Sequence, residues 1–275
     1  MDRSLLVLVV VACALAVLVL YANGANYAIG NERRAALPAV PIMYPNGKTV
    51  LVTTETTTRN KYTWTVGGRA HEWDSIAYVY GKLAETVRAR GSARLVDVGA
   101  QSGLYALYAR HFPGVVVDAY EPFPESYECL VANIALNGIG DRVSALAVAL
   151  SNTRETKTMR YTPEHTGLNT LGASPLRFSG GSEIQVETRT MDAVYATTRV
   201  DVVKIDTEGW EYFVLLGGLT VLRRDRPELI LEVNDTNMQQ CGVTSAALMA
   251  LVSDLGYRYV ATIDDENMAL SAAPR

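Results

Sequence analysis

The sequence has few of the residues that form sulfur-based metal and redox centres. Its three cysteines are Cys13, Cys129 and Cys241, and no two of them have C-x-x-C spacing. A zinc site or a redox dithiol therefore has no support. Isolated thiols at Cys129 and Cys241 are the favoured interpretation, and a single disulfide between them is the alternative.

The chain also lacks an excess of positive charge. Its 25 lysines and arginines are outnumbered by 29 aspartates and glutamates, which gives a net charge of −4. A mildly acidic chain does not attract a phosphate backbone, so nucleic acid is excluded as a main partner. Glycine and proline are not in excess either, at 21 and 10 of 275 residues, while 49% of the chain is apolar. This composition excludes collagen-like and disordered chains and supplies an ordinary core.

One long apolar run lies at the amino terminus. Residues 5–20 are all apolar, and Tyr21 and Ala22 extend the run to eighteen residues. A helix of that length measures about 27 Å, close to the hydrocarbon core of about 30 Å. Because the apolar regions of signal peptides usually have about 7–15 residues, we predict a single-pass transmembrane anchor at 1–22, with a cleaved signal peptide as the alternative. This places the protein at a membrane, on a side that the flanking charges do not decide.

From residue 73 onward, apolar strands alternate with amphipathic helices. Core strands are predicted at 95–98, 115–120, 143–150, 200–205 and 229–233, and helices at 73–91, 104–108, 124–138, 213–222 and 246–255. The last two strands, 257–263 and 268–272, should form an antiparallel hairpin at the sheet edge. This order predicts an α/β fold with a doubly wound, Rossmann-like, mostly parallel sheet.

Two regions lie outside this alternation. Residues 23–70 are predicted as a linker, which runs to residue 44, and a short β segment that follows the turn at Pro45-Asn46-Gly47. Residues 71–275 then form the main domain. Within that domain, residues 151–199 form an insertion with strand-like pieces, and insertions of this size between core strands are commonly functional. We predict that the insertion caps the binding site of an acceptor.

A glycine-containing turn follows the first core strand. The strand ends near Asp97, and Gly99 and Gly103 let the backbone turn tightly and approach a ligand closely. Glu121 ends the next strand 22 residues after Gly99, near the offset of about 20 residues at which a carboxylate binds ribose hydroxyls. The spacing G-x-x-x-G differs from the dinucleotide motif G-x-G-x-x-G. Together these residues predict a nucleoside-bearing cofactor without a pyrophosphate.

Further acidic residues follow the fourth and fifth core strands. Asp206 and Glu208 come after the fourth, and Glu232 and Asn234 close the fifth. Carboxylates among apolar strand residues are costly to bury, so we expect them to face a cleft. Solvated acids at the entry of a helix are the alternative.

Six segments, in their order and spacing, resemble the FkbM family of S-adenosylmethionine-dependent methyltransferases. They are residues 95–105, 120–122, 133–137, 149–151, 204–211 and 227–233. The resemblance covers about residues 73–272 and leaves the first 70 residues outside it. The chain departs from the family at Gln101, where the family usually carries asparagine.

The resemblance implies methyl transfer from S-adenosyl-L-methionine, often to a hydroxyl of a sugar or a natural product. The acceptor would then be a small molecule or a glycan. The turn at 97–103 would hold the amino-acid end of the cofactor, Glu121 its ribose, and 149–151 the edge of the adenine. The residues expected to bind the cofactor are Asp97, Gly99, Ala100, Gln101, Gly103, Tyr105, Glu121, Ser151 and Asp206.

Transfer to a hydroxyl requires alignment of donor and acceptor and a base for the hydroxyl proton. Asp206 is the first candidate base, Glu208 the second and His165, in the insertion, the third. In a variant of this hypothesis, Asp206, Glu232 and Asn234 bind Mg²⁺, which lowers the pKa of the hydroxyl. Only the ligand type and position support that metal, so no residue is assigned to it.

Two other function classes remain open at this point. The Asp206-x-Glu208 pair would suit a membrane-anchored glycosyltransferase in which Mn²⁺ binds a nucleotide sugar. The glycine turn argues against that class. A non-catalytic module that binds the cofactor is the other alternative, and the intact acidic residues argue against it.

Overall fold

The computed structural model describes residues 39–53, 65–66, 69–70, 72–162, 166–172, 181–264 and 266–273. They belong to one compact unit that begins at Ala39. In the part of the chain described, no helix is both long and apolar enough to cross a membrane. The predicted anchor at 1–22 and the candidate base His165 lie outside the described residues, so both stay predictions.

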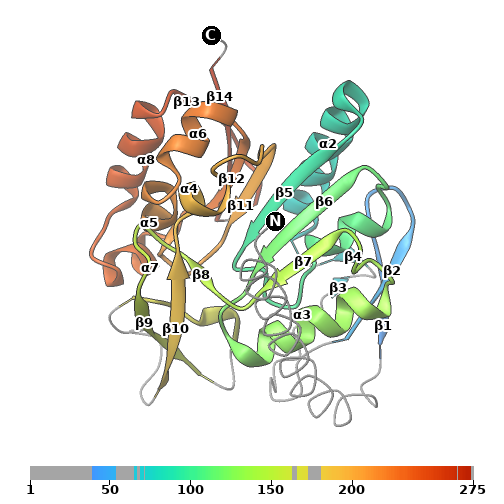
Figure 1. Cartoon of the computed structure of the whole chain (residues 1–275), viewed down its shortest axis with the longest axis horizontal. Coiled ribbons are helices and arrows are strands. Elements are labelled where there is room, and N and C mark those ends of the chain that lie inside the picture. The colour runs from blue at the N-terminus through green and yellow to red at the C-terminus, as the bar shows by residue number, and fades with distance from the viewer. Residues whose placement is uncertain are drawn as a thin grey trace, which may run out of the picture. The chain divides into compact units, whose positions relative to one another are not determined.

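Seven strands form the central sheet, in the order β13-β14-β12-β11-β5-β6-β7 (Figure 1). They are β5 (Ala93–Val98), β6 (Val115–Tyr120), β7 (Val143–Leu146), β11 (Val202–Ile205), β12 (Glu228–Glu232), β13 (Tyr257–Thr262) and β14 (Asn267–Ala272). The parallel part of the sheet consists of five neighbouring strands, β12, β11, β5, β6 and β7. Strand β14 is antiparallel to both of its neighbours. The mostly parallel sheet is confirmed, with an antiparallel hairpin at one edge.

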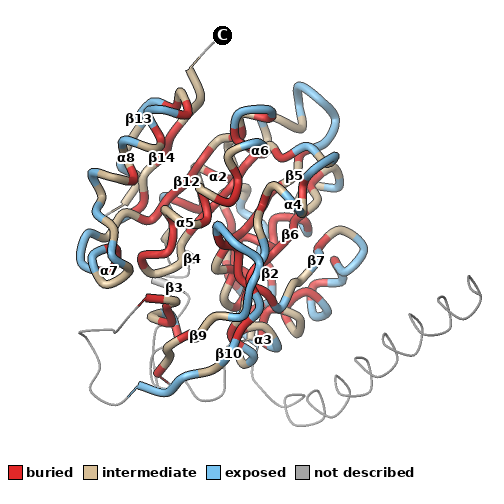
Figure 2. Tube along the Cα trace, turned by 60° about the vertical axis from the view of Figure 1, so that its left-hand side comes forward, coloured by how far each residue is buried: buried red, intermediate tan, exposed pale blue. Residues whose placement is uncertain are grey.

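Alternate residues of the sheet supply two separate cores, as the pleat of a strand requires. Leu95 and Val202 pack with α2 (Trp73–Arg90), α3 (Pro124–Leu136) and the 3₁₀ helix η1 (Ala106–Arg110). Val96 and Val203 face the opposite way, toward the later helices. These are α4 (Met191–Val194), α5 (Glu211–Leu216), α6 (Leu219–Asp225), α7 (Asp235–Gln240) and α8 (Ser245–Asp254). Figure 2 shows the central strands as the buried interior between these layers.

Two predicted elements are interrupted in the structure. The strand predicted at 143–150 divides into β7 and β8 (Ala149–Leu150), which leaves the central sheet and pairs with β10. The helix predicted at 213–222 divides into α5 and α6 at Gly217, where a Cβ atom would lie 2.0 Å from the backbone oxygen of Ser151. The close approach of these two backbones therefore explains the glycine at the break.

The insertion at 151–199 forms a small sheet of its own, in the order β8-β10-β9. It contains β9 (Thr156–Tyr161), the short 3₁₀ helix η2 (Thr166–Leu168) and β10 (Ser182–Arg189). Strand β10 is antiparallel to β9 over residues 182–187 and parallel to β8 at its last two residues. The insertion is thus hydrogen-bonded to β8, the strand that follows β7 in the chain.

Residues before α2 form a second small sheet. It contains β1 (Val40–Met43), β2 (Thr49–Val52), β3 (Thr65–Val66) and β4 (Arg69–Ala70), in the order β2-β1-β4-β3. The turn at Pro45-Asn46-Gly47 joins β1 to β2, so the linker prediction was wrong for β1. Ile42 and Val50 are buried in the same core as α2. Cys129 and Cys241 are both free, which confirms the thiol interpretation.

Candidate active site

The turn after β5 is held against two neighbouring strands. The N–H groups of Gly99 and Ala100 both donate to the carbonyl oxygen of Tyr120, at 3.0 Å each. Gly99 has φ +78°, and a Cβ atom there would lie 1.8 Å from the backbone oxygen of Asp206. Only glycine fits this close approach, which brings the carboxyl ends of β5, β6 and β11 together.

Glu121 fixes this turn from the end of β6. Its Oε2 accepts the N–H of Gln101 and its Oε1 accepts the N–H of Phe123, both at 2.8 Å. The residue is 6% exposed. Each of the two carboxylate oxygens thus accepts a backbone N–H, which fixes the orientation of the carboxylate beside the turn. The predicted proximity of Glu121 and the glycine turn is therefore present in the structure.

A buried lysine lies beside this turn and was not predicted as a site residue. Lys204 pairs with Asp97 across β11 and β5, and its Nζ lies 2.9 Å from Oδ2 of Asp206. The same ammonium lies 4.7 Å from the ring centroid of Tyr105, whose hydroxyl donates to Glu72. Burial lowers the pKa of Lys204, but the charges of Asp206, Glu72 and Asp97 raise it well above its usual value. Lys204 is therefore a fixed positive charge.

Asp97 is completely buried, and neither of its carboxylate oxygens has a hydrogen-bond partner among the described residues. Burial raises the pKa of Asp97 to about 7. The positive charge of Lys204 opposes this rise, whereas Asp206 and Glu72 add to it. Asp97 is thus a carboxyl group held in a costly environment, which is typical of functional positions.

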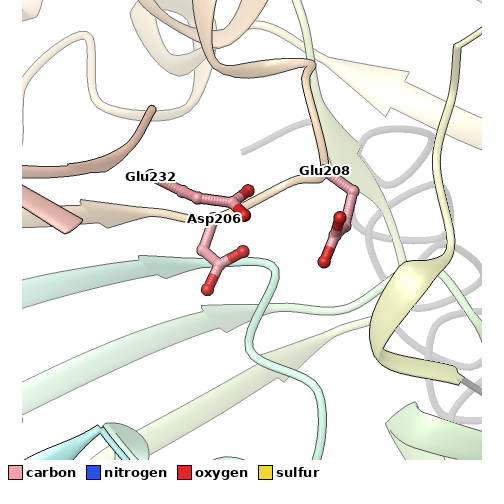
Figure 3. Close-up of side chains that lie close together, drawn as sticks. All are labelled: Asp206, Glu208 and Glu232. Carbon is pink, nitrogen blue, oxygen red and sulfur yellow. The ribbon is translucent and has the colours of Figure 1, made fainter. Parts of the chain in front are cut away.

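Three carboxylates meet at the ends of β11 and β12. Asp206, Glu208 and Glu232 each offer an oxygen, and these oxygens lie within 4.8 Å of one another. Figure 3 shows the three carboxylate groups around a common space, and we call them the acidic cluster. Burial and the charges of Asp206, Glu208 and Glu211 raise the pKa of Glu232 well above its usual value.

Glu208 belongs to this cluster, whereas Asn234 does not. Glu208 has φ +55°, and its Oε2 accepts a hydrogen bond of 2.6 Å from Nδ2 of Asn237. Asn234, which the sequence predicted beside Asp206 and Glu232 as a ligand, is used elsewhere. Its Oδ1 caps α7 through the N–H of Asn237, and its Nδ2 donates to Glu266. Glu208 therefore takes the place predicted for Asn234.

The insertion contacts both parts of the site. Oγ1 of Thr170 donates to the backbone oxygen of Glu208 at 2.9 Å. Gly167 lies so close to Gln101 that a Cβ atom there would be 3.3 Å from Nε2 of that side chain. Residues 166–172 thus lie against the glycine turn and the acidic cluster, where a cap over the acceptor would have to be.

Two predicted cofactor contacts have side chains already engaged within the protein. Ser151 is fully buried, and its hydroxyl accepts from the indole of Trp210 and donates to Asn152. Tyr105 is 4% exposed and donates to Glu72. Glu72, which comes immediately before α2, was missed because no sequence motif surrounds it.

Comparison with known proteins identifies the family. The sequence profile of the methyltransferase FkbM domain matches residues 97–259. The methyltransferase sdnD of Sordaria araneosa is 28% identical over 193 residues, which cover 59% of this chain and 73% of that protein.

Solved structures of methyltransferases are also similar to the chain. The methyltransferase FkbM of Methylobacillus flagellatus has a TM-score of 0.44 at 17% identity, over 65% of this chain and 43% of that one. The methyltransferase PaMTH1 of Podospora anserina, bound to SAH, has a TM-score of 0.40 at 12% identity, over 72% and 79% of the two chains. The match to the FkbM domain confirms the resemblance of the six segments, and the chain belongs to the FkbM family of methyltransferases.

Proposed function

We propose that the protein transfers a methyl group from S-adenosylmethionine to a hydroxyl group of a sugar, a glycan or a small molecule. The observation that carries this proposal is the pairing of Glu121 with the glycine turn. The carboxylate that would bind the ribose also accepts the N–H of Gln101, so one residue sets both the turn and the ribose position. The absence of a side chain at Gly99 lets the turn pack against the backbone of Asp206, which places Asp206 beside the turn that would hold the amino-acid end of the cofactor.

The acidic cluster suits the chemistry of a hydroxyl acceptor. When bound, the cofactor supplies an electrophilic methyl group on a sulfonium. The acceptor oxygen forms the new bond to that carbon as the carbon–sulfur bond breaks, and the electron pair of the broken bond stays on sulfur. The hydroxyl proton passes to Asp206, whose side chain is 22% exposed and thus within reach of a substrate. Lys204 holds one oxygen of Asp206 and so orients the carboxylate.

A binding experiment tests the cofactor site. Replacing Glu121 with alanine removes hydrogen bonds of a charged group, each worth about 1.5–3 kcal/mol. The dissociation constant for S-adenosylmethionine, measured by calorimetry, should therefore rise at least about tenfold. Glu128→Ala removes an exposed glutamate from the same region and should leave the affinity unchanged. Equal affinity in the Glu121→Ala variant and the native protein would refute the assignment.

A second experiment separates an enzyme from a module that only binds the cofactor. Asp206→Asn should bind S-adenosylmethionine with an affinity close to native but lose transfer of a radiolabelled methyl group into a fraction of glycans and small molecules. Full transfer by this variant would exclude Asp206 as the base and leave Glu208 as the next candidate. Membership in a methyltransferase family already favours methyl transfer over the glycosyl transfer considered from the sequence.

We also infer from the eighteen apolar residues at 5–22 that the enzyme is anchored in a membrane by residues 1–22. The full-length chain should then leave cell membranes with detergent and stay with them in alkaline carbonate. Recovery of a soluble chain that starts after residue 22 would show instead that the segment is a cleaved signal peptide.

A further inference from the structure

The acidic cluster has a feature that a proton-accepting role does not explain. Glu232, the last residue of β12, is 6% exposed, and its Oε2 has no hydrogen-bond partner within the described part of the chain. Its carboxylate is directed into the space that it shares with Asp206 (Figure 3). A buried charged oxygen without a partner costs several kcal/mol unless something compensates it.

The side chains around the cluster do not compensate this negative charge. Glu211, at the start of α5, is fully buried, and its Oε2 also has no partner in the described residues. The ammonium that faces the cluster, Lys204, already pairs with Oδ2 of Asp206. A single proton on Glu232 would neutralise only that residue and would leave the charges of Asp206 and Glu208 in place.

We propose that Asp206, Glu208 and Glu232 bind a divalent cation, Mg²⁺ or the similar Mn²⁺. Carboxylate oxygens without sulfur or imidazole are the ligands that these hard cations prefer. Two oxygens on opposite sides of Mg²⁺ are about 4.2 Å apart, because each bond is about 2.1 Å. Oxygens that all lie within 4.8 Å of one another therefore surround a cation after small rotations of the side chains.

The backbone places these ligands without help from the cation. Gly209 has φ +101°, and a Cβ atom there would lie 2.4 Å from the backbone oxygen of Asn237. This close packing, with the hydrogen bond from Asn237 to Glu208, fixes the turn that carries Glu208. Glu232 is fixed by its strand, and Asp206 is fixed by its N–H bond to Val98. A preformed set of ligands lowers the cost of binding.

The role of the cation rests on the proposed function. At the ends of β11 and β12 the cation would contact the acceptor hydroxyl and lower its pKa, as bound metal ions do for water. With the cation bound, Asp206 and Glu208 would act as ligands, and the hydroxyl proton would pass to solvent instead of to Asp206. Without the cation, one of these carboxylates would have to take the proton.

Titration of the purified full-length chain with Mn²⁺, without cofactor, tests the site directly. Electron paramagnetic resonance of free Mn²⁺ should show one bound ion per chain, and Mg²⁺ should displace it. Glu232→Gln keeps the shape of the side chain and removes its charge, and it should raise the dissociation constant at least tenfold. Glu187→Gln removes an exposed carboxylate on β10 (70% exposed) and should bind Mn²⁺ as the native chain does.

Two results would overturn the inference: no Mn²⁺ bound at millimolar concentration, or equal binding by the native chain and Glu232→Gln. A thermal melt of Glu232→Gln that matches the native chain shows that lost binding is not lost folding. Calorimetry with S-adenosylmethionine in the presence of a chelator separates this test from that of the proposed function. Cofactor binding without Mn²⁺ binding refutes the cation site alone, and Mn²⁺ binding without cofactor binding refutes the proposed cofactor alone.

Discussion

Replacement of Asp97 with asparagine should stabilise the protein, although it changes a residue of the candidate active site. Burial raises the pKa of Asp97 to about 7 in the folded chain, against 3.8 for an aspartate in water. The stability that the protonated group contributes is fully present below pH 3.8 and is lost as the pH rises through about 7. Asparagine has no charge to bury. A difference of about three pKa units corresponds to about 4 kcal/mol, which is the upper limit of the gain at pH 8.

Urea unfolding of the cofactor-free chain between pH 5 and pH 8 measures this gain. The free energy of unfolding of Asp97→Asn should exceed that of the native protein by about 1.5 kcal/mol at pH 5, and the excess should grow toward pH 8. Asp118→Asn is the matched control with the opposite sign. Asp118 accepts bonds from Arg94 and Tyr195, so its loss should cost about 3 kcal/mol. An excess for Asp97→Asn that is zero, negative or independent of pH would refute the reasoning.

Three further predictions concern the fold around the site. Gly99→Ala should lower the free energy of unfolding in urea by more than about 3 kcal/mol, because its Cβ would lie 1.8 Å from a backbone oxygen. Gly91→Ala is the control, since Gly91 has a similar φ of +79° but no atom near the added Cβ, and it should lower the free energy by about 1 kcal/mol. Burial lowers the pKa of His111, so the stability from its neutral form is complete above about pH 6.5 and is lost as the pH falls through the lowered pKa. His111→Gln should therefore lose less stability than the native chain between pH 7.5 and 5.5. Trp210→Phe removes the hydrogen bond to Ser151 and should lower the free energy of unfolding by about 1 kcal/mol, beyond any loss of packing.

The central strands could be predicted because their own residues determine them. Strand β6 spans residues 115–120, as predicted, since a buried parallel strand is mostly apolar and all of its residues except Asp118 are apolar. The predicted elements are wrong where backbone segments that are far apart in the sequence come into contact. The approach of Gly217 to Ser151 divides a predicted helix, and no local periodicity contains that contact. Strand β1 was missed for the same reason, because its pairing with β2 and its burial against α2 are properties of the folded chain.

The site shows the same division between local and long-range signals. The offset between Gly99 and Glu121 predicted their proximity, because adjacent parallel strands of similar length end at the same edge of the sheet. Sequence spacing could not decide between Glu208 and Asn234 as the third member of the acidic cluster. That choice depends on a helix cap at Asn234. Lys204 begins the segment 204–211 of the family resemblance but received no role there, because only the fold shows that its ammonium faces Asp206.

The burial of negative charge in the candidate site has a physical explanation if the site binds positively charged ligands. Within the described residues, Asp97 and Glu232 are both buried and have carboxylate oxygens without a hydrogen-bond partner, so their negative charges oppose folding. A sulfonium cofactor and a divalent cation are both positive, and each would stabilise the ionised carboxylates on binding. Ligand binding should therefore raise the thermal midpoint of the native protein more than that of Asp97→Asn, because the variant has no buried charge to relieve. An equal rise in the two proteins would show that the charge of Asp97 does not take part in binding.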